Sequence, residues 1–457
     1  MKIIYSIVRQ TIRENLRSRV FHVLLVLTLL SALLLPLTVV GDGTAAAAAQ
    51  AILTYSLQAV TVLLTLAAVW LGCTGLSREI ESHRIHMVLT KPVAPWQVWL
   101  GKWLGVVCVT GAILAASALL VFLLIQWRVR SDEFSAEEVA RAQREVLTGR
   151  RFLQPDRPDL RSVVESEYNR LLESGTLEPG HSPEAVRSEL MRRYRAREGE
   201  VQPYRVRRWR FPRVPDVSND TPRSIFFRYR LYVASASESA QRETVGFWRF
   251  YNPQAPPETG ELYLRQNIRG GLFHELELSD ELLAGGGFLT VEYLNTDPRE
   301  EIVIFQAADG PELMLPAAGF ADNYWRGMAV IFLRLCFFAA LGCALGAMFS
   351  GPVALFVAFA YMVLSIVVDS VLGGAAAETA PAGYGMVSYL LLVGLDKILL
   401  SLQEFDIPSL LSGGQLVDNA RIASAAILQV LLRGGPLALL AILVFSRREL
   451  GKVVRQT

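Results

Sequence analysis

The residues best suited to chemistry lie in a charged segment between two apolar stretches. Glu79 and Glu81 are followed by His83 and His86, and a Lys-Pro dipeptide comes further along the chain. Two histidines three positions apart, without a third ligand, do not make a metal site. By themselves these residues are those of an ordinary polar helix face, and we expect no metal site.

Patterns for catalysis and for nucleotide binding are missing from the sequence. It has no GxxxxGK[ST] motif and no Gly-rich turn between a strand and a helix, so it cannot hold ATP in a P-loop. Ser412 lies in a Leu-Ser-Gly-Gly stretch that slightly resembles an intramembrane nucleophile, but no histidine lies on any later apolar stretch. We therefore expect no catalytic residue and no cofactor bound by this chain.

The elements that position the charged segment are predicted to be membrane helices. The chain has 457 residues, of which 52% are hydrophobic and only 19% are charged, and its mean hydropathy is +0.33. This apolar excess over an ordinary globular composition indicates membrane spans. All four cysteines lie inside apolar runs, so we expect neither a disulfide-stapled domain nor a Cys-based zinc site.

Six stretches contain about 18 or more apolar residues, which is enough to cross a bilayer. These predicted transmembrane helices are Val20–Val40, Ile52–Leu76, Leu104–Gln126, Gly327–Phe349, Pro352–Leu372 and Ala425–Phe445. The first three, with the loop 77–102, make up residues 20–127. The first stretch is longer than the roughly 7–15 apolar residues of a signal peptide, so we interpret it as a retained helix.

Charge predicts the orientation of these helices. Residues 1–19, the loop after the second stretch and the C-terminal tail are each net positive, whereas the loops on the other side are net negative. The positive-inside rule therefore predicts that both termini are cytoplasmic. Within residues 1–19, apolar side chains recur at i, i+3 and i+4 spacing opposite a basic arc, which predicts an interfacial amphipathic helix.

Residues 128–323 are predicted to form an extracytoplasmic domain of the α+β class, inserted into the α-helical membrane protein. Its first part, 131–200, has helical patterns that include a helix from Ser135 to Thr148. Its second part, 223–316, contains seven short runs punctuated by turn residues. Strands at this spacing favour a β-sandwich or a jelly roll.

An arginine-rich stretch at 192–213 raises the question of nucleic-acid binding. Acidic residues are mixed with arginines across the same domain, so the electrostatic field is not that of a basic face. We therefore expect no nucleic-acid partner and interpret the stretch as a solvated helix followed by a strand. Contact with membrane lipid or with a periplasmic protein stays open.

Residues 324–457 contain the last three predicted spans and one ambiguous stretch. Met386–Leu402 is apolar but carries an Asp-Lys pair in its second half, so we interpret the extracytoplasmic segment 373–424 as re-entrant or interfacial. Within the spans, Arg334 could reach Asp369 to form an intramembrane charge pair, or each side chain could extend separately to the membrane surface.

The charged segment resembles the signature of type-2 ABC exporter permeases. It reads Ser77-Arg-Glu-Ile-Glu-Ser-His-Arg-Ile-His-Met-Val-Leu-Thr-Lys-Pro-Val93, then Ala94-Pro-Trp-Gln-Val-Trp-Leu-Gly-Lys102. In that family an acidic pair, a short helix, a Leu-Thr-Lys-Pro-Val turn and a Gly-Lys before the third span form the loop that contacts the ATPase. Family members often carry Ser-Arg after Lys-Pro-Val, where this chain has Ala-Pro.

The resemblance implies a permease subunit whose ATPase-coupling loop lies at residues 77–102. The loop residues that it singles out are Arg78, Glu79, Glu81, Arg84, Lys91, Pro92 and Lys102. It also implies a separate ATPase subunit that binds ATP and magnesium, and a second permease subunit that is identical or different. Closure of the ATPase would push the loop and tilt the spans, either to export a substrate or to act mechanically on an extracytoplasmic partner.

The subgroup of that family with a large insertion between the third and fourth spans fits best, which implies the bacterial cytoplasmic (inner) membrane. A competing interpretation is a membrane-tethered binding or sensor protein that transports nothing. Six spans exceed what an anchor requires, and an anchor does not explain the charged loop with its Lys-Pro turn.

Overall fold

The computed structural model describes most of the chain and divides it into two compact units. The described residues are 2–38, 43–81, 93–131, 133–156, 159–174, 182–214, 225–234, 243–256, 258–306, 310–374, 391, 394–395, 397, 399–400 and 406–447. One unit comprises Met1–Gly149 together with Ala318–Thr457, and the other comprises Arg150–Ala317. We call them the helical unit and the β unit and describe each by itself.

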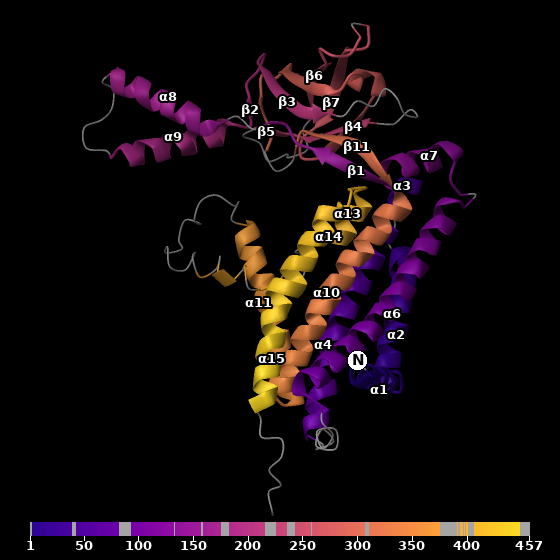
Figure 1. Ribbon diagram of the computed structural model, residues 1–457. Coiled ribbons are helices and arrows are strands. Elements are labelled where there is room, and N and C mark those ends of the chain that lie inside the picture. The colour runs from indigo at the N-terminus through magenta and orange to yellow at the C-terminus, as the bar shows by residue number, and fades with distance from the viewer. Residues whose placement is uncertain are drawn as a thin grey trace, which may run out of the picture. The chain divides into compact units, whose positions relative to one another are not determined.

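The helical unit contains the membrane-spanning elements (Figure 1). Its first half consists of α1 (Lys2–Leu16), α2 (Arg19–Thr38), α3 (Ala45–Ala51), the π-helix η1 (Ile52–Ser56), α4 (Leu57–Glu81), α6 (Pro95–Val129) and α7 (Ala136–Glu145). Its second half consists of α10 (Phe320–Met348), α11 (Gly351–Gly374), α13 (Ile407–Ser412), α14 (Asn419–Ala425), the π-helix η3 (Ala426–Gly434) and α15 (Gly435–Arg447).

Six helices in the described part of the chain are long and apolar enough to cross a membrane. They lie at Arg19–Pro36, Ala45–Glu81, Pro95–Val129, Phe320–Met348, Gly351–Val371 and Asn419–Arg447. The six predicted spans are confirmed, although several helices extend beyond their apolar stretch at one end. The helical membrane protein with an inserted β-rich part is confirmed as the fold class.

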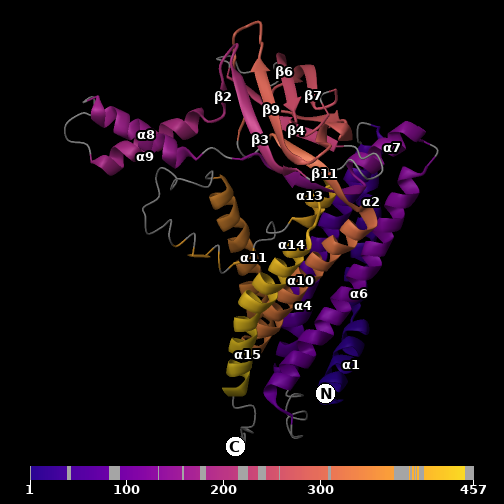
Figure 2. The same ribbon diagram turned by 45° about the horizontal axis from the view of Figure 1, so that its top comes forward.

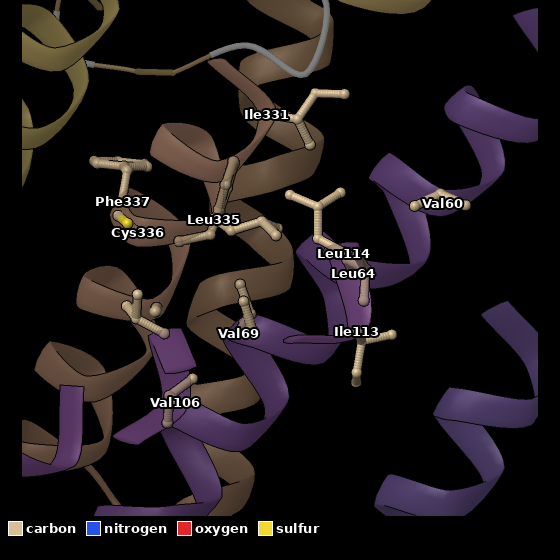
Figure 3. Close-up of a cluster of buried hydrophobic side chains, with 14 of the residues drawn as sticks. Val60, Leu64, Val69, Val106, Ile113, Leu114, Ile331, Leu335, Cys336 and Phe337 are labelled. Atoms are coloured by element: carbon tan, nitrogen blue, oxygen red, sulfur yellow. The ribbon is translucent and has the colours of Figure 1, made fainter. Parts of the chain in front are cut away.

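The core of the helical unit lies between α4, α6 and α10. The most apolar window of α10 is 83% buried, whereas that of the last helix is only 17% buried, so α10 is the central helix. Figure 3 shows Leu64 and Val69 of α4 and Leu114 of α6 beside Leu335 of α10, all of them buried. The outer helices expose apolar side chains, as expected for a surface that contacts lipid.

Asn323 near the start of α10 fixes the segment between α13 and α14. Its Nδ2 donates to the carbonyl oxygen of Gln415 at 2.8 Å, and its Oδ1 accepts from the backbone nitrogen of Val417 at 2.7 Å. One turn further along α10, a Cβ added to Gly327 would lie 2.8 Å from Cγ2 of Ile407, so only glycine lets α13 approach this closely. Most of the predicted re-entrant stretch before α13 lies outside the described residues.

The β unit is built from antiparallel sheets. Its strands are β1 (Thr148–Leu153), β2 (Glu200–Val201), β3 (Val206–Val214), β4 (Ile225–Arg230), β5 (Tyr232–Ala234), β6 (Glu243–Tyr251), β7 (Glu261–Arg269), β8 (Phe273–Leu278), β9 (Gly287–Asn295), β10 (Ile302–Ile304) and β11 (Glu312–Gly319). The sheet orders are β1-β11-β4-β8, β2-β10-β5 and β3-β9-β6-β7. Figure 2 shows these strands together with the helices of the β unit, α8 (Leu160–Glu173) and α9 (Pro183–Arg197).

Aromatic side chains join the two four-stranded sheets. Phe227 of β4 lies with its ring centroid 5.0 Å from Trp248 and 5.1 Å from Phe250, both on β6. Trp248 also contacts Tyr229 and Tyr293, and all five side chains are fully buried. Burial raises the pKa of both tyrosines. The core of the β unit therefore lies between two sheet faces, as in a sandwich.

The helices of the β unit form a hairpin with a small core of its own. Val164 and Tyr168 of α8 cluster with Leu190 of α9. Arg187 donates two hydrogen bonds of 2.8 Å to Glu165, and this hydrogen bonding lowers the pKa of the glutamate. The charge pair and the apolar contacts together hold the two helices side by side.

Local sequence signals locate most of these elements. Ser135 caps α7, and Glu138 returns a hydrogen bond in a capping box, but the helix ends at Glu145 instead of the expected Thr148. Residues 146 and 147 form a turn, and β1 begins at Thr148. Neither β1, which lies in the part 131–200 that was expected to be helical, nor the two-residue β2 was predicted from the sequence. Helix α7 packs on α3, and contacts assign residues up to Gly149 to the helical unit, so the 22 residues 128–149 cluster with the helices instead of with the β unit.

Candidate functional site

Helix α1 lies along the first half of α6, and two glycines make this approach possible. A Cβ on Gly101 would lie 2.7 Å from Cγ2 of Ile7, and a Cβ on Gly105 would lie 2.6 Å from Cβ of Thr11. Ile7 and Thr11 are the buried residues of α1, as expected for the apolar face of an amphipathic helix. The helix is therefore held along its length by the surface of α6.

Lys102 of α6 connects three helices through its side-chain nitrogen. Nζ donates to Oε2 of Glu14 on α1 at 3.2 Å and also to Oε1 of Glu79 at the end of α4. The side chains of Lys102 and Glu79 are 5% and 16% exposed, whereas that of Glu14 is 48% exposed. We call Glu14, Glu79 and Lys102 the ionic junction.

Burial determines what each member of the ionic junction contributes. A buried ammonium group loses its hydration and needs anionic partners nearby to offset the loss. Glu79 is the more buried carboxylate, so water screens its interaction with Lys102 least. Water and salt weaken the contribution of the half-exposed Glu14. The contact between α4 and α6 is therefore the stronger link, and α1 is attached by the weaker one.

Glu81 connects the same end of α4 to the start of α11. Its Oε1 accepts a hydrogen bond of 3.1 Å from the backbone nitrogen of Gly351, the first residue of α11. Nitrogens of the first helical turn have no partner within their own helix, and a carboxylate there is also favoured by the helix dipole. The last turn of α4 therefore contacts α6 through Glu79 and α11 through Glu81.

Two tryptophans extend the junction from α6 to α10. The indole rings of Trp99 and Trp103 are stacked, with centroids 6.2 Å apart. Nε1 of Trp103 donates to the carbonyl oxygen of Cys336 at 2.9 Å. Because Trp103 follows Lys102 in the sequence, the start of α6 contacts α10 as well as α1 and α4.

The structure brings together only some of the residues singled out in the sequence. Glu79 and Lys102 are in contact, Glu81 binds the start of α11, and Arg78 is exposed. Arg84, Lys91 and Pro92 lie outside the described residues. Glu14 was missed as a site residue, although it is an acidic residue in a basic amphipathic segment, which is an available signal.

The structure also places the charged residues that lie within the predicted spans. Arg334 of α10 is buried, and Asp369 of α11 is half-buried. Among ion pairs between described residues, none joins these two side chains. Nε of Arg433, in η3, donates to the carbonyl oxygen of Lys397 at 3.2 Å. In the described part of the chain, no group of three His, Cys, Asp or Glu side chains could hold a metal ion.

Comparison with known proteins gives a match for the first half of the helical unit, which contains the ionic junction. Residues 5–140 match the model of a family described as ABC-2 family transporter protein. No curated protein matches the chain. The matched residues run from α1 into α7 and include all three members of the ionic junction. The match confirms the resemblance that the loop motif indicated.

Proposed function

We propose that this ABC-2 type permease receives the force of ATP hydrolysis from a separate ATPase subunit at the ionic junction. The observation that carries the proposal is the contact of Lys102 with both Glu14 and Glu79, because it joins α1 to the two helices, α4 and α6, whose ends belong to the predicted coupling loop. Residues 82–92 connect α4 to α6 between Glu79 and Lys102. A force on this connection therefore acts first on the ion pair between Glu79 and Lys102.

The basic N-terminal helix and the basic segment after α4 support a cytoplasmic location for the ionic junction. An ATPase subunit is then on the same side of the membrane as the loop. The β unit is on the opposite side of the membrane, because the chain crosses the membrane three times between residues 19 and 129. The composition of the chain, with six spanning helices and no P-loop, suits the membrane subunit of such a transporter in the bacterial inner membrane.

The proposed mechanism is a shear between packed helices. Movement of the loop pulls the ends of α4 and α6 together or apart. The ion pair between the half-exposed Glu14 and Lys102 is weak, so α1 either moves with α6 or separates from it. The tryptophan contact with Cys336 passes the displacement to the central helix α10. Small shifts at such an interface are amplified when the packed helices have two stable arrangements. A second permease subunit completes the path, and the same movement serves export or mechanical work on an extracytoplasmic partner.

The test compares Lys102→Met with Lys2→Met in the full permease reconstituted with its ATPase subunit. Both variants lose one positive charge and keep an unbranched apolar chain, but Lys2 is exposed on α1 whereas Lys102 is buried. We expect Lys102→Met to keep the ATPase bound and to lose the stimulation of ATP hydrolysis by the membrane subunit. Lys2→Met should behave as wild type.

Thermal unfolding in detergent separates a coupling defect from a folding defect. If Lys102→Met has a monodisperse profile and stimulates ATP hydrolysis as wild type does, the ionic junction does not couple the subunits. A copurification that finds no ATPase subunit with the wild-type chain contradicts the proposal as a whole and favours the tethered-sensor interpretation.

A further inference from the structure

One face of the sheet β3-β9-β6-β7 is buried in the core of the β unit, and the other face is exposed. Along β6, Trp248 and Phe250 are buried while Phe247 and Tyr251 are exposed. The same alternation exposes Tyr263 on β7. The pleat of a strand requires this arrangement, because successive side chains point to opposite faces. The open face therefore presents aromatic rings to the surroundings.

Cross-strand pairing arranges the open face in rows. In one row Val206 of β3, Leu294 of β9 and Phe247 of β6 follow one another, and Arg265 of β7 ends the row. The residues of this row are apolar except for the arginine, and Val206 and Phe247 are among the exposed large apolar side chains. Exposed apolar side chains that adjoin one another, bordered by charged residues, are typical of an interaction site.

The next two rows contain charges that neutralise each other. Glu292 accepts from Arg208 at 2.6 Å and from Arg249 at 3.2 Å. Glu261 accepts from the Tyr263 hydroxyl at 2.6 Å and also from Arg249. The Tyr263 hydrogen bond, followed by that of Arg249, lowers the pKa of Glu261 and keeps it ionised. These two carboxylates therefore hold Arg208 and Arg249 in place.

Two further arginines on this face have no carboxylate partner among the described residues. The guanidinium of Arg210 lies over the ring of Phe288 at 4.1 Å, and that of Arg265 lies over the ring of Phe247 at 5.9 Å. Stacking on a ring orients a guanidinium but leaves its N–H groups available for an anion. The open face therefore carries two positive charges that are oriented and not neutralised.

The register gives the separation of these two arginines. Arg210 lies on β3 and Arg265 on β7, three strands apart and two rows apart. With strands about 4.8 Å apart and residues about 3.4 Å apart, the two positions are about 20 Å apart. About six residues of an extended chain cover that distance. A single small anion cannot contact both arginines.

The area of the face limits the kind of partner. Three rows over four strands cover about 14 Å by 14 Å, which is far less than the ~800 Å² that one partner buries in a standard interface between folded proteins. A single extended segment needs less area. Aromatic residues and arginine are the types enriched at the centres of protein interfaces, and an apolar row requires apolar side chains opposite it.

We infer that the open face of β3-β9-β6-β7, represented by Arg210, Phe247 and Arg265, binds an extended acidic polypeptide segment that carries apolar side chains between its carboxylates. Carboxylates pair with the two arginines, and apolar side chains cover Phe247 and its neighbours in the row. An acidic polysaccharide offers the charge but lacks side chains for the apolar row. This inference goes beyond the coupling role of the ionic junction and depends on none of its residues.

The test uses the full-length chain in nanodiscs and a fluorescein-labelled random copolymer of glutamate and tyrosine as the probe. Fluorescence anisotropy should show binding that becomes about tenfold weaker in Arg265→Ala and in Phe247→Ala, which is the loss expected when a residue that carries much of the binding energy is truncated. Arg161→Ala is the matched control, because Arg161 is an exposed arginine of the β unit outside this sheet. Binding by this control should equal that of wild type.

The competing outcomes are distinguishable. Equal weakening in Arg161→Ala would mean unspecific attraction between charges and would overturn the inference. If polyglutamate binds as tightly as the copolymer and Phe247→Ala has no effect, apolar side chains do not contribute to binding. This result would also overturn the inference. Tighter binding of polygalacturonate than of the copolymer would assign the face to a polysaccharide. Phe247→Tyr should retain binding, which separates loss of contact from loss of fold.

Discussion

Gly72 of α4 and Gly342 of α10 touch through their backbones. A Cβ on Gly72 would lie 2.9 Å from the carbonyl carbon of Gly342, and a Cβ on Gly342 would lie 2.7 Å from the carbonyl oxygen of Val69. Gly346, one turn further along α10, would place a Cβ 2.6 Å from the carbonyl oxygen of Cys73. Small residues four positions apart allow membrane helices to approach this closely, so packing between backbones holds the two central helices together.

Gly342→Ala is expected to destabilise the helical unit. The added methyl group meets backbone atoms that cannot move independently, and overpacking of this kind costs about 1–3 kcal/mol. Gly75→Ala is the matched control, because a Cβ there meets nothing within 4 Å. The control should be neutral or stabilising, since alanine favours a helix over glycine by up to about 1 kcal/mol. Thermal unfolding in detergent checks the pair, and equal transition temperatures would contradict the close contact.

Within the ionic junction, Glu79→Gln should destabilise the protein more than Glu14→Gln. A hydrogen bond to a buried charged group contributes about 2 kcal/mol, and Glu79 is much less exposed than Glu14. Combining Glu79→Gln with Lys102→Met should recover part of the loss, because the double variant leaves no buried cation without its partner. A double-mutant cycle in thermal unfolding measures the interaction. Strictly additive effects would mean that the two side chains do not interact.

Gln429→Leu is expected to stabilise the protein. This side chain is 0% exposed in η3, and neither polar atom of its amide has a hydrogen-bond partner in the part of the chain that the structure describes. Burying an unsatisfied polar group costs about 1–3 kcal/mol, which an apolar residue of similar size avoids. Gln50→Leu, at an exposed position of α3, should have little effect. A lower transition temperature for Gln429→Leu would indicate that water or a ligand binds the amide.

Residues 150–317 are expected to fold when expressed alone. All four cysteines lie outside this range, so folding needs no oxidant. Trp248 and Phe250 are buried in the core of the β unit itself, whereas Phe247 is exposed. A cooperative thermal transition in a monodisperse sample is the expected result. Trp248→Ala should lower the stability by about 3–5 kcal/mol, whereas an aggregated wild-type fragment would show that the β unit depends on the rest of the chain.

The membrane topology predicts opposite labelling of two engineered cysteines. Ser182→Cys, before α9, should react with an impermeant maleimide in intact cells, whereas Ser446→Cys, at the end of α15, should react only after permeabilisation. The exposed Cys108 is replaced by serine in both variants so that it does not contribute to the signal. Labelling of position 446 but not of 182 in intact cells would reverse the orientation and remove the ionic junction from the cytoplasmic side.

The sequence by itself determined the elements whose signals are local. A long apolar stretch makes a span because every buried backbone group must be paired within its own helix, and this holds whatever the neighbours are. Alternation along β6 and β9 and the cap at Ser135 depend on residues only a few positions apart. The loop motif at 77–102 pointed to the resemblance that the family-model match over residues 5–140 supports.

Only the tertiary structure decided which of these residues meet. Lys102 lies 88 positions from Glu14, and Arg210 shares a sheet face with Arg265 only through the register of four strands. No local pattern specifies such pairs, since they depend on how helices and strands approach one another. Close approach depends on glycines such as Gly101 and Gly342, whose effect is visible only once the opposing backbone is in place. The sequence thus indicated which residues carry charge, and packing decided that Glu79 faces a buried lysine.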